Sequence, residues 1–170
     1  DRSGSRGVTK VNSAQEIKSD IQRAISESLA KEALIEEFIE GKEYSVEMIS
    51  WKGVHHHLQI TEKETSGAPY FVEKSQHQPA SLSIEIQGKI IKLIKRSLSA
   101  LGIENGASHS EIIINKDENI FIVEIGARMG GDFIGSDLVQ LSTGFDFVKA
   151  VIEISLGFFK GVKINENKYS

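Results

Sequence analysis

Apolar residues recur at helical spacing in two long stretches of the chain and predict two helices. The first stretch begins at "SAQE", residues 13–16, whose serine and glutamate have the spacing of a capping box. The second stops at Gly102, a residue type suited to ending a helix. The apolar positions are Ile17, Ile21, Ala24, Ile25 and Leu29 in the first stretch and Ile90, Ile91, Ile94, Leu98 and Leu101 in the second. This periodicity predicts helices over 14–31 and 82–101.

Other stretches alternate apolar and polar residues, which is typical of half-buried strands. "EYSVEMISW" alternates in this way, and "WKGV" predicts a turn into the return strand "HHHLQITEK". "SHSEIII" and "NIFIVEI" predict a hairpin around the turn residues "NKDEN". We also expect a short strand in "ALIEEFIEG", a loop over 64–80 around a short strand at 70–72, and two late helices separated by Thr143 and Gly144.

The order of these elements and the composition limit the class of protein. Strands and helices follow the order of an antiparallel meander with helices interspersed, which favours an α+β fold. The net charge of −4 leaves no excess of Lys and Arg to neutralise phosphates, so we expect no nucleic-acid binding. The chain has no cysteine, which excludes disulfides and thiolate metal sites. No apolar run approaches the ~20 residues of a membrane span and the start is not a signal peptide, so we expect a cytoplasmic protein without membrane contact.

Two glutamates are predicted to face each other across the second hairpin. If its loop consists of residues 116–119, Asn115 pairs with Ile120 and Glu111 pairs with Glu124. Directly opposed like charges are destabilising, but a divalent cation between the carboxylates would offset the repulsion. Mg²⁺ suits such oxygen ligands and is completed by waters and substrate phosphates. An odd loop would place the glutamates on opposite faces, and two exposed acids at strand ends are an equally weighted alternative.

An arginine and two glycines follow this predicted pair. Arg128 offers a planar, permanently charged donor fork, which suits a phosphoryl group or an acyl phosphate. Gly130 and Gly131 let backbone N–H groups approach an anion without a side-chain clash. Each feature alone is also compatible with surface charge or a turn. Together with the paired glutamates they predict a site for phosphoryl transfer.

These motifs resemble those of the ATP-grasp superfamily. Glu111 followed by "VEIGARMGG" is similar to its metal-binding end, an acid followed after a gap by E-x-N-x-R. "ALIEEFIEGKEYSVE" is similar to its hinge strand and ribose-side acid, and "SGSRGV" to its glycine-rich loop over the triphosphate. The resemblance covers nearly the whole chain and implies an ATP-grasp C-terminal subdomain, an antiparallel sheet packed with helices.

The resemblance also implies roles for individual residues. Arg128 would be catalytic by stabilising the phosphoryl group in transfer, and Glu111 and Glu124 would hold Mg²⁺ or Mn²⁺. Glu36 would accept from the adenine amino group, and Glu43 would bind the ribose hydroxyls. The complete set of implied ATP contacts is Ser3, Gly4, Ser5, Arg6, Gly7, Glu36, Glu37, Ile39 and Glu43. Candidates for substrate binding are His109, Gly130 and Gly131, and a structural role for the histidine is a close alternative.

Two departures from the superfamily pattern affect what is implied. Gly126 stands where an asparagine usually ligates a second metal, and the lysines that hold the α- and β-phosphates are expected before Asp1. We therefore expect residues 1–32 to be the phosphate loop and helix of a preceding subdomain and residues 33–170 to be the C-terminal subdomain. The N-terminal domain of the full protein is expected to be absent from this chain.

The function implied by the resemblance is that of a ligase fragment, inactive alone. The full-length enzyme would use ATP and Mg²⁺ to join a small carboxylate to an amine or to ammonia through an acyl phosphate, and we also consider a homodimer. "GASHSEI" with "EIGARMGG" is most similar to amino-acid ligases and to carbamoyl-phosphate-synthase-like proteins. A non-catalytic nucleotide-binding module is the alternative, which Gly126 favours. A regulatory metal site at His55 and His57 is a third hypothesis, although an ordinary strand explains these histidines more simply.

Overall fold

The computed structural model describes residues 6–67 and 72–163, which belong to two compact units. The first unit contains residues 1–39 and 64–75, and the second contains residues 40–63 and 76–170. Helix α1 (Ile17–Glu27) lies in the first unit. Among the described residues, no helix combines the length and the apolar character needed to cross a membrane.

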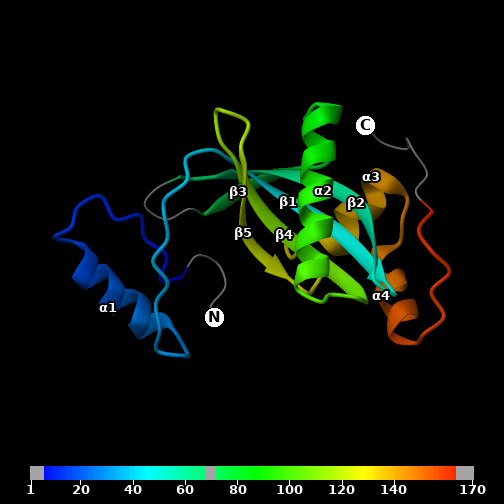
Figure 1. Ribbon diagram of the computed structural model, residues 1–170, viewed down its shortest axis with the longest axis horizontal. Coiled ribbons are helices and arrows are strands. Elements are labelled where there is room, and N and C mark those ends of the chain that lie inside the picture. The colour runs from blue at the N-terminus through cyan, green and yellow to red at the C-terminus, as the bar shows by residue number, and fades with distance from the viewer. Residues whose placement is uncertain (1–5, 68–71, 164–170) are drawn as a thin grey trace. The chain divides into compact units, whose positions relative to one another are not determined.

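The sheet has the strand order β3-β2-β1-β4-β5 (Figure 1), and residues of the second unit make up most of it. The strands are β1 (Lys42–Trp51), β2 (Val54–Thr65), β3 (Glu73–His77), β4 (Gly106–Ile114) and β5 (Ile120–Gly126). Strand β1 pairs antiparallel with β2 and β4, and β4 pairs antiparallel with β5. The helices of this unit are α2 (Ile84–Ala100), a π-helix (Ile134–Leu138), α3 (Val139–Thr143) and α4 (Phe147–Ser155). This arrangement confirms the predicted α+β class with an antiparallel sheet.

The turn between β1 and β2 follows from two residues. Trp51 pairs with Val54, so Lys52 and Gly53 form a two-residue hairpin loop. Their φ angles are 51° and 75°, and positive φ at both central positions is the signature of a type I′ turn. The right-handed twist of the strands favours this turn type, and the hairpin predicted from "WKGV" is confirmed.

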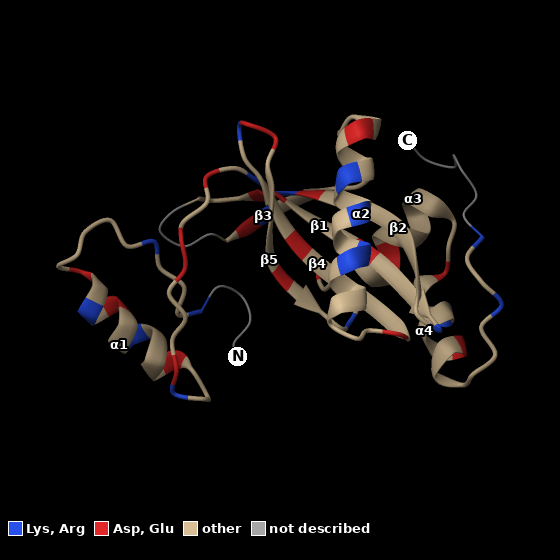
Figure 2. Ribbon diagram, in the orientation of Figure 1, with Lys and Arg blue, Asp and Glu red and all other residues tan. Residues whose placement is uncertain are grey.

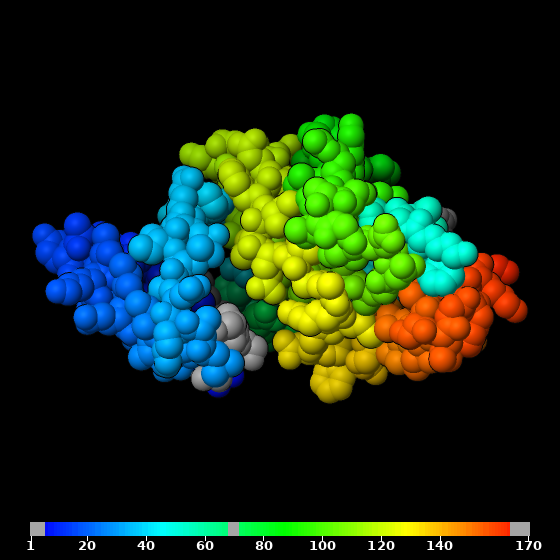
Figure 3. Space-filling view, turned by 60° about the horizontal axis from the view of Figure 1, so that its bottom comes forward, coloured from blue at the N-terminus to red at the C-terminus, as the bar shows by residue number. Residues whose placement is uncertain are grey.

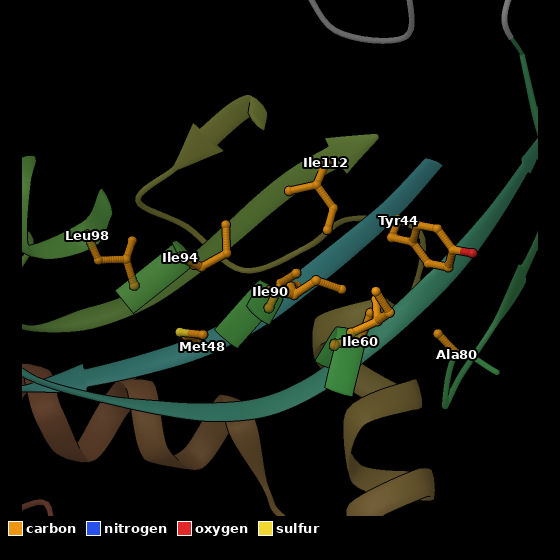
Figure 4. Packing of buried hydrophobic residues seen from close by; sticks show 10 residues of the cluster. Tyr44, Met48, Ile60, Ala80, Ile90, Ile94, Leu98 and Ile112 are labelled. Atoms are coloured by element: carbon orange, nitrogen blue, oxygen red, sulfur yellow. The ribbon is translucent and has the colours of Figure 1, made fainter. Parts of the chain in front are cut away.

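Helix α2 covers one face of the sheet and forms the larger core. The Ser83 hydroxyl caps the helix by accepting from the Ile86 N–H at 3.3 Å. Ile90, Ile94 and Leu98 recur at helical spacing and are fully buried (Figure 4). They pack against the β-strand residues Tyr44, Val46, Met48, Ile60 and Ile112. The side chains of β1 at even-numbered positions therefore point toward α2.

A second core lies on the opposite face and covers only one end of it. Ile49 follows Met48 on β1, and successive side chains of a strand point to opposite faces. Ile49 packs with Ala107 of β4, with Val139 of α3, and with Phe147, Ala150 and Ile154 of α4. Toward the other end of this face, the residues that continue the same period are polar. The fold therefore leaves a polar strip beside an apolar core on one side of the sheet.

The local pattern misplaced several elements. Helix α1 spans Ile17–Glu27 rather than 14–31, and Glu16 precedes it without a side-chain cap. The segment 33–41 contains no strand, because the first ladder of β1 begins at Lys42. Strand β3 occupies residues that were predicted to be loop, and most of the predicted strand at 70–72 lies outside the described residues. Helix α2, both hairpins and the break at Gly144 are confirmed.

Candidate functional site

The polar strip on the sheet collects several predicted site residues. Across the ladder of β1 and β4, Ser45 opposes Glu111, Glu47 opposes His109 and Ile49 opposes Ala107. Because these pairs are separated by two residues, all of them share the face on which Ile49 packs against α4. Figure 2 shows acidic residues on β5 and on neighbouring strands. The strip therefore places acids from three strands beside the second core.

The predicted opposition of Glu111 and Glu124 is confirmed, but by a different route. The hairpin loop has five residues, 115–119, because Ile114 pairs with Ile120. The Asn115 side chain stabilises this longer loop by accepting from the N–H groups of Asp117 at 3.0 Å and Asn119 at 2.9 Å. A β-bulge then follows, so that Ile112 pairs with Ile122 while Glu111 pairs with Glu124. The extra residue, Val123, cancels the odd loop and restores the pairing.

Glu111 lies in a strongly cationic environment. Its Oε1 atom accepts from His109 Nε2 at 3.3 Å and from the Lys63 ammonium at 3.0 Å. The Lys63 side chain is 3% exposed, so this ion pair is poorly screened by solvent. The hydrogen bond from His109, opposed by burial and reinforced by Lys63, lowers the pKa of Glu111 to about 2. Glu111 is therefore ionised at neutral pH.

His109 is buried between two carboxylates. Its Nδ1 atom is hydrogen-bonded to Glu47 Oε1 and its Nε2 atom to Glu111 Oε1. Burial would lower the pKa of His109, but the hydrogen bonds to Glu111 and Glu47 outweigh it and raise the pKa to about 9. The imidazolium form donates from both nitrogens, which matches two acceptors. The structure shows His109 hydrogen-bonded to both Glu47 and Glu111. That His109 also contacts the substrate stays a prediction.

Gly130 occupies a position that only glycine can fill without displacing its neighbours. Its N–H group donates to Glu47 Oε2 at 3.1 Å. A Cβ atom at this position would lie 2.7 Å from Glu47 Oε1 and 2.9 Å from His109 Nδ1. At Gly131 a Cβ atom would meet nothing within 4 Å. The two glycines therefore differ, since only the first is required by close packing.

Arg128 extends along the surface at the end of β5. Its guanidinium donates from Nη1 to the Met129 carbonyl at 3.0 Å and from Nη2 to Glu124 Oε1 at 3.5 Å. Half of the side chain is exposed, and in the space-filling view the segment after β5, in yellow, forms part of the surface (Figure 3). A Cβ atom at Gly126 would lie 3.2 Å from Arg128 Cγ. The arginine therefore covers the place where a side chain at 126 would begin.

Glu111 and Glu124 form a donor set that fits one Mg²⁺ or Mn²⁺ ion. Both carboxylates are hard oxygen donors on opposed positions of one ladder, and both contacts of Glu111 that involve His109 and Lys63 use Oε1. Within residues 6–67 and 72–163, no cluster of three or more His, Cys, Asp or Glu side chains is arranged to hold a metal. Two protein carboxylates leave the remaining positions to phosphates and waters, as is usual for Mg²⁺.

The residues expected to contact the nucleotide lie in both units. Glu43 lies on β1 in the second unit, opposite Lys63 and Ile113. Glu36, Glu37 and Ile39 belong to an irregular segment of the first unit, in which both glutamates are exposed. Arg6 and Gly7 lie in the first unit as well, and Gly7 has a φ of 80°. Ser3, Gly4 and Ser5 lie outside the described residues.

Two charged residues of the strip were missed by the sequence analysis. The alternation along "EYSVEMISW" predicts that Glu47 lies on the polar face of a half-buried strand, yet it is completely buried. Lys63 is the last residue of the predicted return strand and receives no role in the predicted site, whereas in the structure it lies within β2 and forms an ion pair with Glu111. The sequence does place Glu47 and His109 on strands where they could face each other. Only the register of β1 against β4, which the sequence does not give, shows that they are paired.

Comparison with known proteins supplies a family and a set of relatives. Residues 1–137 match the family model of the ATP-grasp domain. D-alanine–D-alanine ligase of Christiangramia forsetii is 35% identical over 128 residues, which are 71% of this chain and 38% of the relative. The crystal structure of L-amino acid ligase from Bacillus licheniformis superimposes with a TM-score of 0.79 at 31% identity, covering 94% of this chain and 37% of that one.

A third comparison extends the likeness in fold. The biotin carboxylase domain of 2-oxoglutarate carboxylase from Hydrogenobacter thermophilus, a structure with MgADP and bicarbonate, has a TM-score of 0.78 at 20% identity. The match covers 99% of this chain and 36% of that chain. The chain spans about a third of the length of the curated relatives it matches. The fold is therefore that of one portion of such proteins.

Proposed function

The chain belongs to the ATP-grasp family, and from this premise we propose that the full-length protein is an ATP- and Mg²⁺-dependent carboxylate–amine ligase. Its substrates are a small carboxylate and either an amine or ammonia. ATP phosphorylates the carboxylate to an acyl phosphate, and the nitrogen nucleophile displaces phosphate to form a C–N bond. The amino-acid ligases among the relatives support this class of substrate. We also propose that residues 33–170 form its C-terminal ATP-grasp subdomain, and cytoplasmic location and a homodimer stay predictions.

One observation carries the proposal: Glu111 and Glu124 oppose each other, and Arg128 contacts the second of them. Their opposition needs a β-bulge, and the pair is destabilising unless positive charge lies near it. Lys63 and His109 supply that charge on the side of Glu111, and Arg128 supplies it on the side of Glu124. Charge neutralisation around transferring phosphates is the main requirement of phosphoryl transfer.

The residues of the strip have distinct proposed roles. Glu111 and Glu124 hold the cation, which supplies charge neutralisation on the phosphates when it is bound. Arg128, half exposed, turns its guanidinium from Glu124 toward the phosphoryl group during transfer. The side chain of Glu36 accepts from the adenine amino group, the backbone of Glu37 and Ile39 meets the ring edge, and Glu43 accepts from the ribose. Arg6 and the amides around residues 3–7, of which 3–5 lie outside the described residues, cover the phosphates. Gly131, where a Cβ atom would meet nothing within 4 Å, offers its backbone N–H to the substrate.

Turnover by the full-length protein tests this function. Mg·ATP is supplied with pools of amino acids, and ADP release together with the mass of any amide product is measured. We expect ADP release that requires both a carboxylate and an amine or ammonia. Arg128→Ala is expected to reduce turnover more than ATP affinity, because its contact strengthens in the transition state. Glu62→Gln, which alters an ion pair with Lys42 at the sheet, is the matched control and is expected to keep activity. ADP release at the same rate with and without the carboxylate and the amine would contradict the proposal.

A non-catalytic nucleotide-binding module is a second candidate, favoured by Gly126. The side chain that would extend from this position is replaced by the stem of Arg128. The two candidates differ in a single measurement, since a module binds ATP without consuming it. Tight ATP binding without ADP release under any pool of acceptors would favour the module.

A further inference from the structure

Glu47 is a buried carboxylate at the centre of the sheet to which the proposed chemistry gives no role. It is completely buried, and both of its oxygens are engaged: Oε1 with His109 Nδ1 and Oε2 with the Gly130 N–H at 3.1 Å. Removing a carboxylate from water is costly, and apolar side chains often stabilise such a position as well or better. Directional bonds to two different elements are what the carboxylate adds.

These two bonds join the parts of the site that lie on different elements. From Glu47 one connection runs through His109 of β4 to Glu111, which His109 contacts at 3.3 Å. The other runs to Gly130, which lies two residues beyond Arg128 in the segment after β5. Arg128 contacts Glu124, which opposes Glu111 across the ladder. These hydrogen bonds, the ladder pair of Glu111 and Glu124, and the chain between Arg128 and Gly130 together form a closed loop of residues that includes Glu47.

On the basis of the proposed ligase function, we propose that Glu47 is a positioning residue, which holds the Gly130 amide and the His109 ring together and so fixes Arg128 relative to Glu111. It does not touch the reacting atoms. Its effect on turnover is transmitted by the segment 128–130, whose position relative to His109 and Glu111 it fixes.

The close approach at Gly130 agrees with this role. A methyl group there would lie 2.7 Å from Glu47 Oε1 and 3.1 Å from the Ile134 side chain, so the chain can keep the contact only with glycine. Glu47 and His109 cannot move aside freely, because both are buried in the ladder of β1 and β4. Pushing the segment outward would therefore move Arg128 with it.

The perturbation is Glu47→Gln in the full-length protein. A glutamate accepts from both donors, whereas a glutamine has one acceptor oxygen and one NH₂ group, so either Gly130 or His109 loses its acceptor. We expect kcat to fall by roughly 10–100-fold with the KM for ATP within about threefold of wild type, as for a small misplacement of a catalytic group. Glu62→Gln is the control for loss of a glutamate charge on the same sheet.

A double-mutant cycle separates positioning from general damage to the fold. If Glu47 acts through the segment that carries Arg128, then adding Glu47→Gln to Arg128→Ala should cost less than about threefold in kcat, because the group it positions has gone. Equal losses in both backgrounds would overturn the proposal, and so would a folded Glu47→Gln variant with normal kcat. Gly130→Ala should reproduce the loss if Glu47→Gln does not fold, with Gly88→Ala on α2 as the control, since a Cβ there meets nothing within 4 Å. Normal turnover in Gly130→Ala would also overturn it.

Amide hydrogen exchange at Gly130 provides a readout that does not need ligase activity. In wild type the N–H bonded to a buried carboxylate should be strongly protected, and Glu47→Gln or Glu47→Ala should raise its exchange rate while amides of α2 keep theirs. An unchanged exchange rate at Gly130 would overturn the proposal that Glu47 holds the Gly130 amide. A different outcome is possible: the wild-type protein releases no ADP, yet the Glu47 variants show the faster exchange at Gly130. In that case the proposed function is wrong, but Glu47 does hold the Gly130 amide.

Discussion

The charged state of His109 predicts a specific loss of stability at high pH. The pKa of His109 is raised from 6.5 to about 9, because hydrogen bonds to Glu111 and Glu47 outweigh the effect of burial. A group whose folded-state pKa is raised stabilises the fold in full below the unfolded pKa, and this contribution disappears as the pH rises through the folded pKa. The difference between the two pKa values corresponds to about 3 kcal/mol of unfolding free energy.

The comparison is between wild type and the double variant Glu47→Gln/His109→Gln. Replacing both partners removes the titrating pair without leaving a lone buried carboxylate opposite the new side chain. Between pH 6 and 9.5, wild type should lose about 3 kcal/mol that the double variant does not lose. Urea unfolding can be followed by the fluorescence of Trp51, the one tryptophan of the chain, which packs edge-on against Phe159 at 6.2 Å.

The profile between about pH 6.5 and 5, above the range in which Glu111 takes up a proton, is an internal control. Burial lowers the pKa of His57 to about 4, so its contribution is lost as the pH falls below 6.5, and this loss should be the same in both proteins. Tyr44, whose pKa is raised by burial, likewise titrates in both proteins. Parallel profiles of wild type and double variant above pH 7 would refute the argument, because they would mean that folding does not raise the pKa of His109.

Three further predictions concern the carboxylates, the adenine contact and the glycine at 126. Without Mg²⁺, Glu124→Gln should leave the free energy of unfolding in urea unchanged or slightly higher, because the repulsion with Glu111 is relieved and the exposed contact with Arg128 is worth little. Turnover should nevertheless fall by orders of magnitude. Normal turnover would mean that the acid merely ends a strand. Glu36→Ala should weaken ATP binding in calorimetry by roughly 1.5–3 kcal/mol with much less change for GTP, and equal losses for both nucleotides would make Glu36 structural. Gly126→Asn should reduce turnover by roughly tenfold, because its Cβ meets Arg128 Cγ at 3.2 Å, whereas a gain in turnover would indicate a restored metal ligand.

The hairpin of β4 and β5 shows how far a local pattern can predict a site. The opposition of Glu111 and Glu124 was predicted from a four-residue loop, and it is produced by a five-residue loop and a bulge at Val123. The segment "NIFIVEI" is apolar at nearly every position, so it has no alternation that would fix the register of the strand. The loop length depends on the bonds that the Asn115 side chain accepts, which spacing alone does not reveal.

Residues that depend on distant partners were the ones that the sequence did not reveal. Glu47 contacts Gly130, which is 83 residues away in the chain, so its burial cannot be inferred from the alternation around β1. In the segment 33–41, Leu34 and Ile35 suggested a strand, yet they are 81% and 70% exposed. A strand needs a partner for its backbone groups, and apolar composition does not supply one. The helices and hairpins were predictable because their signals are local.

We propose that this ATP-grasp chain belongs to a ligase that activates a carboxylate as an acyl phosphate, and the transfer of a carboxylate oxygen to phosphate distinguishes this route from hydrolysis of ATP by water. The full-length protein is supplied with Mg·ATP, an amine source, and amino acids whose carboxylates are labelled with ¹⁸O, in unlabelled water. The γ-phosphorus bonds to a carboxylate oxygen, and that oxygen leaves with phosphate when nitrogen attacks the acyl carbon. We predict that each phosphate released carries one ¹⁸O atom from the carboxylate. Phosphate released without label would contradict the claim, because its oxygen would have come from water.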